Sequence, residues 1–210
     1  MASRMGLSRR RLLVLSAGVI AGLGLTASGQ AADDAVDTVR GFYETLLAVM
    51  KEGKQASFDK RYARLAPAIE RAFNLALMIR IAVGPAWAGL PTAQQQRLVE
   101  AFKRYTVSTY TNRFDDFSGE RFEVSPTPVS NPNGTIVETR LVPTNGEAVT
   151  LNYLLRHDGA GAWQIIDVFL SGTVSELATR RSEFATVLQQ DGAEGLARLL
   201  DERSSKMRAG

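Results

Sequence analysis

The stretch Trp163–Phe184, which reads W-Q-I-I-D-V-F-L-S-G-T-V-S-E-L-A-T-R-R-S-E-F, is the most informative part of the chain. Its first eight residues are mostly apolar and predict a buried strand that ends before Gly172. The side chain of Ser175 is placed to accept hydrogen bonds from the free amide groups at the start of a helix. The stretch therefore predicts a strand, a turn and a helix that together close the fold.

Three further stretches of alternating apolar and polar residues precede this strand. They cover residues 122–124, 135–141 and 149–155. Asn145-Gly146 and Asp158-Gly159 are turn signals between neighbouring stretches. The pattern predicts four strands in an antiparallel meander.

Apolar residues at helical spacing predict helices ahead of the sheet. Asp34 can cap the first helix, which ends at Gly53, and Ser57 opens the second helix. Pro67 should then break or kink the chain, or begin a new helix. Residues 68–83 are apolar nearly all round, which is typical of a helix that is deeply buried or lines an apolar cavity.

A further helix begins near Thr92, where Thr92 and Gln95 fit a capping box. After the sheet, residues 175–190 and 193–203 are predicted to form two closing helices, and residues 204–210 a frayed tail. This order of elements predicts an α+β fold, in which N-terminal helices pack on a curved four-strand antiparallel sheet. The arrangement resembles a nuclear-transport-factor-like cone with added C-terminal helices, and we expect it to enclose an apolar cavity.

Residues 1–31 resemble an export signal peptide. Basic residues, including Arg9–Arg11, precede an apolar run of 14 residues at 12–25, and small residues follow that suit cleavage. The run is shorter than the about 20 apolar residues of a spanning helix, although an uncleaved anchor stays open as an alternative. Residues 8–13 also resemble a twin-arginine motif, so both export routes remain open. The remaining residues, 32–210, suffice for one domain with a sizeable core.

The net charge of +3 comes largely from the signal segment. Without its four arginines, the chain has 21 Lys and Arg against 22 Asp and Glu. The composition therefore gives no support for nucleic-acid binding. The chain has no cysteine, which excludes disulfides and a lipid-anchored lipoprotein, so stability must come from packing alone.

Few residues in the chain suit catalysis. The one histidine, His157, lies beside a predicted turn and is expected to be exposed. The chain lacks a cysteine nucleophile, an H-E-x-x-H metal motif, a P-loop and a G-x-S-x-G serine motif. Asp167 is the best acid/base candidate, because burial within a strand would raise its pKa. The alternative is that Asp167 accepts a structural hydrogen bond or pairs with an arginine. We expect no enzyme activity, no metal and no cofactor.

The same stretch that opened this section resembles the closing strand and following helix of the MlaC (toluene-tolerance) family of periplasmic lipid carriers. The pattern G-T-V-S-E-L-A-x-R-R-S-E-F is most similar to the hopanoid-associated HpnM branch. The resemblance covers about residues 33–203 of this chain. It is strongest at Trp163, Asp167, Gly172, Ser175, Arg181 and Phe184.

The resemblance implies a periplasmic carrier that binds one lipid, a hopanoid or a phospholipid, in an apolar cavity. Such a carrier would shuttle the lipid between a transporter embedded in the inner membrane and an acceptor or donor complex in the outer membrane. Family members typically read D-V-x-x-x-G-V-S-L, whereas the turn at Gly172–Glu176 is one residue longer here. This difference favours a hopanoid as the cargo. The family signature also implies that either Arg180 or Arg181 ties its helix to the sheet.

The residues expected to bind the lipid come from the apolar helices and the last two strands. They are Leu75, Met78, Ile79, Val83, Trp87, Phe102, Tyr105, Val149, Leu151, Tyr153, Val168 and Leu170. Side chains alternate along the strand at residues 163–170, so the sequence leaves open whether the face with Val168 or the face with Asp167 points into the cavity. Arg80 either extends from the core edge to water, or lies at the cavity mouth facing a phosphate or polyol head.

Two alternatives to a carrier remain open from the sequence. One is a cone-fold enzyme that uses Asp167 as an acid or base. The other is an accessory subunit that docks on a membrane transporter, with a filled cone and no bound lipid.

Overall fold

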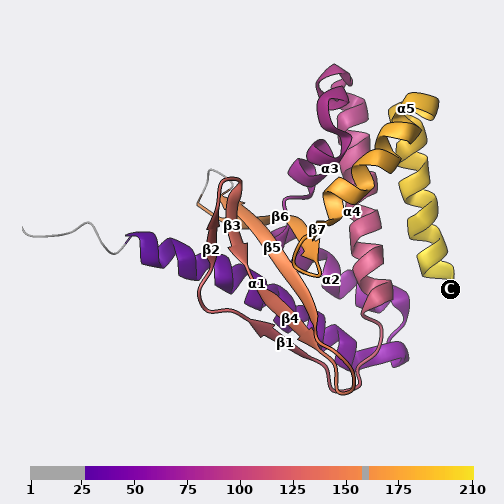
Figure 1. Cartoon of the computed structure of the whole chain (residues 1–210). Coiled ribbons are helices and arrows are strands. Elements are labelled where there is room, and N and C mark those ends of the chain that lie inside the picture. Colours follow the sequence, from indigo (N-terminus) through magenta and orange to yellow (C-terminus); the bar gives the residue numbers. More distant parts are fainter. Residues whose placement is uncertain (1–26, 158–160) are drawn as a thin grey trace, which may run out of the picture.

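An open antiparallel sheet forms one layer of the protein, and helices cover it on one side and extend beyond it (Figure 1). The computed structural model describes residues 27–157 and 161–210. The predicted export signal therefore lies outside the described residues, except for its last five residues, which belong to the first helix. Mixed α+β architecture with helices, then a sheet, then helices is confirmed.

The first two helices follow the apolar pattern of the sequence. Helix α1, Ala27–Glu52, begins earlier than predicted, so Asp34 lies inside it and is not its cap. A short 3-10 turn, η1 (Gly53–Gln55), leads to helix α2, Phe58–Ala72. Ser57 caps α2 as predicted, because its side chain accepts a hydrogen bond from the Lys60 amide (3.3 Å).

The chain breaks between α2 and helix α3, Leu75–Val83, rather than at Pro67, which lies inside α2. Phe73 is extended and forms a β-bridge with Ile165, whose carbonyl accepts a hydrogen bond from the Asn74 amide (2.9 Å). The Asn74 side chain then caps α3. The prediction of one continuous helix over residues 68–83 is wrong, because this pairing with the sheet overrides local helix preference.

Helix α4, Thr92–Arg113, is reached through a 3-10 turn, η2 (Gly84–Gly89). The predicted capping box is wrong, because Thr92 is already helical and makes no capping hydrogen bond. Gln95 instead donates from Nε2 to the carbonyl oxygen of Trp87 (3.0 Å). This contact ties η2 to the first turn of α4.

The sheet follows the predicted meander, but its outer strands are broken. Strands β3 and β4 are separated only by Glu138, and both pair with β5 on the same side, while β6 pairs with its other side. Strand β1 pairs with β4, and β2 pairs with β3. At the other, open edge of the sheet, the short strand β7 pairs with β6. The bounds are β1 Arg121–Val124, β2 Val129–Asn131, β3 Gly134–Val137, β4 Thr139–Val142, β5 Val149–His157, β6 Trp163–Leu170 and β7 Val174–Ser175.

The last helix, α5 (Glu176–Ala209), begins at the predicted cap. Ser175 accepts a hydrogen bond from the amide three residues further on (3.0 Å). Gly192 (φ 68°, ψ −172°) is not helical and divides α5 into two halves, close to the two predicted helices. The prediction of a frayed tail over residues 204–210 is wrong, because α5 continues through it and Ser204 is buried.

An aromatic cluster joins the helices to the sheet. Phe42 of α1 packs edge-on against Phe73 (ring centroids 5.1 Å apart) and Tyr110 of α4 (5.3 Å), and also meets Tyr153 of β5 (6.5 Å). Such edge-to-face contacts add to the burial of large apolar area. In residues 27–157 and 161–210, no helix is both long and apolar enough to cross a membrane.

Candidate functional site

A mostly apolar cavity of about 100 Å³ lies between α4, the sheet and the first half of α5. Its walls come from α3, α4, β5, β6 and α5, together with Phe73 and Phe114, which lie next to α3 and α4. The lining residues are Phe73, Met78, Phe102, Tyr105, Thr106, Thr109, Tyr110, Arg113, Phe114, Leu151, Tyr153, Val168, Leu170, Glu176, Leu177 and Arg180.

One face of α4 forms the longest wall of the cavity. Its lining residues start at Phe102 and recur at intervals of three or four through Tyr105, Thr109 and Arg113. This spacing keeps side chains on one face of an α-helix. The wall is apolar near Phe102 and becomes polar towards the C-terminal end of the helix.

The sheet forms the opposite wall. Leu151 and Tyr153 of β5 and Val168 and Leu170 of β6 are two residues apart on their strands, so each pair shares a face. The structure therefore places Val168 and Leu170 towards the cavity. Asp167 points to the other side of the strand.

Two tyrosines of the aromatic cluster, Tyr110 and Tyr153, line the base of the cavity, and Tyr43 packs against Tyr153. The Tyr43 hydroxyl pairs with Thr139 Oγ1 (2.7 Å). Burial raises the pKa of Tyr43 to about 12 and also raises the pKa values of Tyr110 and Tyr153. All three hydroxyls are therefore neutral at physiological pH, and the base of the cavity carries no charge.

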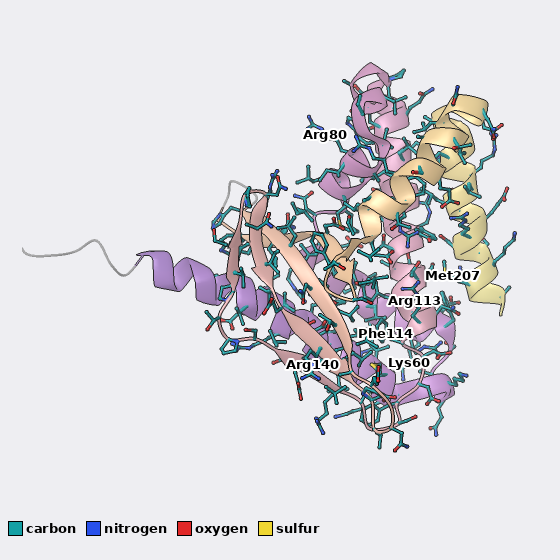
Figure 2. The ribbon with its side chains drawn as sticks, in the orientation of Figure 1. Lys60, Arg80, Arg113, Phe114, Arg140 and Met207 are labelled. Carbon is teal, nitrogen blue, oxygen red and sulfur yellow. The ribbon has the colours of Figure 1, made fainter. Side chains whose placement is uncertain are left out.

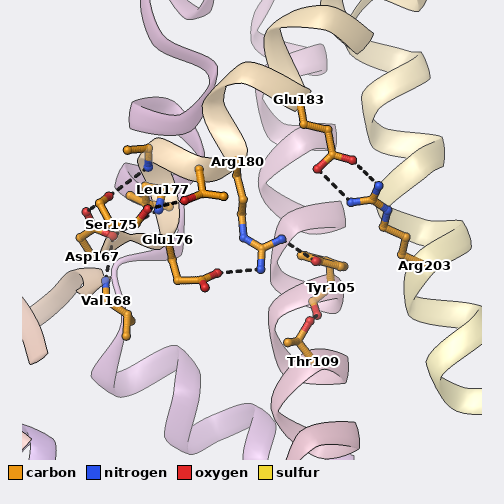
Figure 3. Close-up of polar contacts among 12 residues, drawn as sticks. Tyr105, Thr109, Asp167, Val168, Ser175, Glu176, Leu177, Arg180, Glu183 and Arg203 are labelled. Carbon is orange, nitrogen blue, oxygen red and sulfur yellow. Dashed lines mark hydrogen bonds and ion pairs between the residues drawn. The ribbon is translucent and has the colours of Figure 1, made fainter. Parts of the chain in front are cut away.

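A charged contact closes one side of the cavity (Figure 3). Arg180 donates from Nη1 to the Tyr105 hydroxyl (2.5 Å) and from Nη2 to Glu176 Oε2 (3.0 Å), and its guanidinium lies 5.0 Å from the centroid of the Tyr105 ring. Only 18% of the Arg180 side chain and 22% of the Glu176 side chain are exposed. The contact joins α5 to α4, which corrects the prediction that the arginine ties its helix to the sheet. Arg181 is exposed and lies against Gly84.

Asp167 serves as a hydrogen-bond acceptor at the junction of β6 and α5 (Figure 3). Its Oδ1 accepts from the amides of Val168 (2.8 Å) and Leu177 (3.3 Å), and its Oδ2 accepts from the Ser175 hydroxyl (2.5 Å). Burial raises the pKa of Asp167, and these hydrogen bonds oppose the shift. Both oxygens are thus used to hold the start of α5, which matches the structural role considered for this residue.

Seven of the twelve residues predicted to bind lipid line the cavity. They are Met78, Phe102, Tyr105, Leu151, Tyr153, Val168 and Leu170. Leu75, Ile79 and Val83 are instead packed into the core on the buried face of α3. Trp87 lies half-buried in η2, and Val149 is 45% exposed at the start of β5. These five do not line the cavity, because an apolar pattern predicts burial and not whether protein or free space lies opposite, and lipid binding by any of the twelve stays a prediction.

Sequence reasoning missed the polar part of the wall. Thr106, Thr109 and Arg113 follow Phe102 and Tyr105 at helical spacing, so extending that apolar stripe down α4 would have found them. Arg80, in contrast, was a candidate for the cavity mouth. It is exposed on α3 and does not line the cavity. Figure 2 shows Arg80 beside α3 and Arg113 near the other end of α4.

A larger hollow of about 500 Å³ lies between α2, α4 and α5. Its lining includes two ion pairs, Asp59 with Arg208 (2.7 Å) and Arg104 with Asp201 (2.8 Å). Burying an acyl chain beside these paired charges would remove them from water without a new partner. The smaller apolar cavity is therefore the better site for an apolar ligand.

Comparison with known proteins agrees with this architecture. The family model described as "MlaC protein" matches residues 41–202. The chain belongs to the MlaC family. Its structure is also similar to that of a phospholipid-binding protein from Ralstonia solanacearum, solved in complex with a phospholipid, with a TM-score of 0.69 and 25% sequence identity. The match covers 83% of this chain and 98% of the Ralstonia chain. Family and fold are thus confirmed, whereas the hopanoid-associated branch stays a prediction.

Proposed function

We propose that this MlaC-family protein is a periplasmic lipid carrier that holds the tails of one lipid in the cavity between α4, the sheet and the first half of α5. The observation that carries the proposal is the apolar lining of that cavity, with an uncharged base and its charged residues on α4 and α5. Burial of an acyl chain there is favourable by about 0.8 kcal/mol per CH₂ group. The phospholipid-binding Ralstonia protein, which shares the fold, supports the proposal.

The small volume of the cavity fits a carrier that must also release its cargo. An apolar cavity of about 150 Å³ accommodates benzene, so 100 Å³ is too small for an acyl chain. Tails can enter only if the walls separate. The first half of α5 is the wall with the fewest buried side chains, Leu177 and Phe184.

The carrier would act between two membranes. Residues 1–31 would direct export to the periplasm, where a transporter embedded in the inner membrane and a complex in the outer membrane would exchange lipid with it. Both hopanoid and phospholipid are candidate cargoes. No catalytic step is part of this proposal, because Asp167 is engaged at the start of α5.

The test is native mass spectrometry, with lipid extraction, of the mature protein purified from a bacterial periplasm without detergent. We expect one lipid per protein in the wild type. Leu170→Trp should fill the cavity and abolish lipid retention. Val149→Trp, at an exposed position near the same end of the sheet, should retain lipid.

Thermal unfolding of both variants shows whether they remain folded. A wild-type protein that stays free of lipid after incubation with both lipid classes would overturn the proposal. Equal lipid retention by both tryptophan variants would exclude this cavity as the binding site.

A further inference from the structure

The lining of the cavity contains three charged side chains, and they are not equally engaged. Glu176 and Arg180 form an ion pair (3.0 Å), and Arg180 also binds the Tyr105 hydroxyl. Arg113 lines the same cavity, yet it forms no ion pair or hydrogen bond with any residue of 27–157 or 161–210. The lining therefore has one positive charge without a partner.

The position of Arg113 puts this charge at the polar end of the α4 wall. It is the last residue of α4, and its side chain is exposed while still lining the cavity. Its charge also acts on the Tyr110 hydroxyl at the cavity base. A guanidinium in this place can reach a group at the entrance while apolar chains lie deeper, between Phe102 and Val168.

A second polar group lies further inside on the same face of α4. Thr106 is only 9% exposed, and its hydroxyl has no hydrogen-bond partner in the described parts of the chain. The hydroxyl is not among the fully buried polar atoms that lack a partner, so water or a ligand in the cavity can reach it and accept its hydrogen bond. Seven residues separate Thr106 from Arg113, or about 10 Å along the helix. The two groups are thus spaced along the path from the cavity interior to its entrance.

Building on the proposed function, we propose that Arg113 selects lipids whose head carries a negative charge. The guanidinium would form a charge-assisted, bidentate hydrogen bond with a phosphodiester or carboxylate at the entrance. Thr106 would donate to an ester or head-group oxygen of the same ligand. Uncharged lipids, including uncharged hopanoids, would bind through their apolar part alone and gain nothing from Arg113.

A purely structural role for Arg113 makes a different prediction. A cation at the C-terminal end of a helix interacts favourably with the helix dipole. If that were its only role, replacing Arg113 would lower the melting temperature and leave the preference among lipids unchanged. The two roles can therefore be separated by comparing lipids of different charge.

The experiment measures binding of four probes to the mature protein after its native lipid has been removed. Phosphatidylglycerol and palmitate carry a phosphodiester and a carboxylate, and diacylglycerol and diplopterol are uncharged. Arg113→Gln should weaken phosphatidylglycerol binding about tenfold, as expected for the loss of one charge-assisted contact, with no change for the uncharged probes. Palmitate binding will weaken by the same factor if Arg113 recognises any negative charge, and it will not weaken if Arg113 requires a phosphodiester.

Two further variants complete the design. Arg80→Gln removes an exposed arginine that does not line the cavity and should leave all four affinities unchanged. Arg113→Lys keeps the charge and should retain part of the preference. Higher salt should reduce the preference of the wild type, because the entrance is solvent-exposed.

The outcomes separate this inference from the proposed function. An equal effect of Arg113→Gln on charged and uncharged probes, or no effect on any of them, would overturn the role of Arg113 while leaving the carrier intact. Failure of the wild type to bind any of the four probes would overturn the carrier itself.

Discussion

The two halves of α5 pack on the same neighbour, α4, but they are held in different ways. Residues 193–209 bury Leu196 and Leu200 completely, and Asp201 binds both Arg97 (2.5 Å) and Arg104 (2.8 Å) of α4. Residues 176–191 bury only two side chains, Leu177 and Phe184, and Arg180 of this half makes a polar contact with Tyr105 of α4. The second half packs mainly into the core, whereas the first half, besides its two core side chains, forms a wall of the cavity.

Under the proposed function, this difference would let one element, bent at Gly192, serve both stability and binding. The firmly packed half keeps α4 and α5 together. The other half has only two buried side chains, and under the proposed function its contacts with α4 are the ones that a ligand would displace. We expect substitutions in the two halves to have different effects, and three of them test the comparison.

The largest expected effect comes from Leu200→Ala. Leu200 has no exposed surface, so its truncation should lower the free energy of unfolding by about 3 kcal/mol through lost burial and a new cavity. Leu188→Ala is the matched control, because Leu188 lies in the first half and is only partly buried. It should cost about 1 kcal/mol. Urea denaturation measures both values, and equal losses would remove the distinction between the two halves.

The bend between the halves is tested by Gly192→Ala. A Cβ at Gly192 would meet no neighbouring atom within 4 Å, so the cost comes from the backbone conformation alone (φ 68°, ψ −172°). Only glycine adopts this region readily, and we expect a loss of about 2 kcal/mol. Gly41→Ala, in the exposed interior of α1, should instead stabilise the protein by about 0.5–1 kcal/mol.

Thermal and urea denaturation of the two alanine variants provide the comparison. Effects of the same sign would show that the bend at Gly192 is not a required feature of the fold.

The smallest expected effect concerns pH and Asp201. Burial opposes ionisation of Asp201, but the hydrogen bonds and charges of Arg97 and Arg104 outweigh it and lower its pKa from 3.8. A lowered pKa stabilises the folded state above pH 3.8, and this contribution disappears as the pH falls through the folded-state value. Asp201→Asn should therefore cost about 1 kcal/mol at pH 7 and make stability less dependent on pH below about 5.

The control for this prediction is Asp59→Asn. Asp59 pairs with Arg208, and both side chains are well exposed, so the change should cost about 0.5 kcal/mol or less. Stability curves from pH 7 down to pH 3 for both variants test the prediction. If the stability of Asp201→Asn depended on pH as that of the wild type does, the packing of residues 193–209 on α4 would not depend on this carboxylate.

Local signals explain which parts of the fold could be predicted from the sequence. The turn after β6, the cap at Ser175 and the alternation in β5 and β6 depend on neighbours along the chain, and all are present. The break at Asn74 could not be predicted, because it depends on pairing with Ile165, far away in the sequence. The helical ending of the chain was missed for a similar reason, since burial of Ser204 depends on packing within the fold.

The candidate site shows the same limit. Helical periodicity placed Phe102 and Tyr105 on one face of α4, and that face lines the cavity. Alternation grouped Val168 with Leu170, but it left open whether their face of β6 points inward. Apolar residues of α3 such as Ile79 satisfy the same pattern but face protein. Charged lining residues were missed because periodicity identifies a face, whereas the partner of each charge depends on the assembled fold.

The junction that Asp167 and Ser175 form has a further consequence for the first half of α5. The segment is fastened to β6 at its start, continues into the well-packed second half at Gly192, and is also tied to that half by the ion pair of Glu183 with Arg203. A helix tethered at both ends cannot swing away as a flap with one free end would. It can bow outwards or roll about its own axis, and both movements change the width of the gap gradually. We expect a cavity bounded in this way to widen gradually as its walls separate around an occupant.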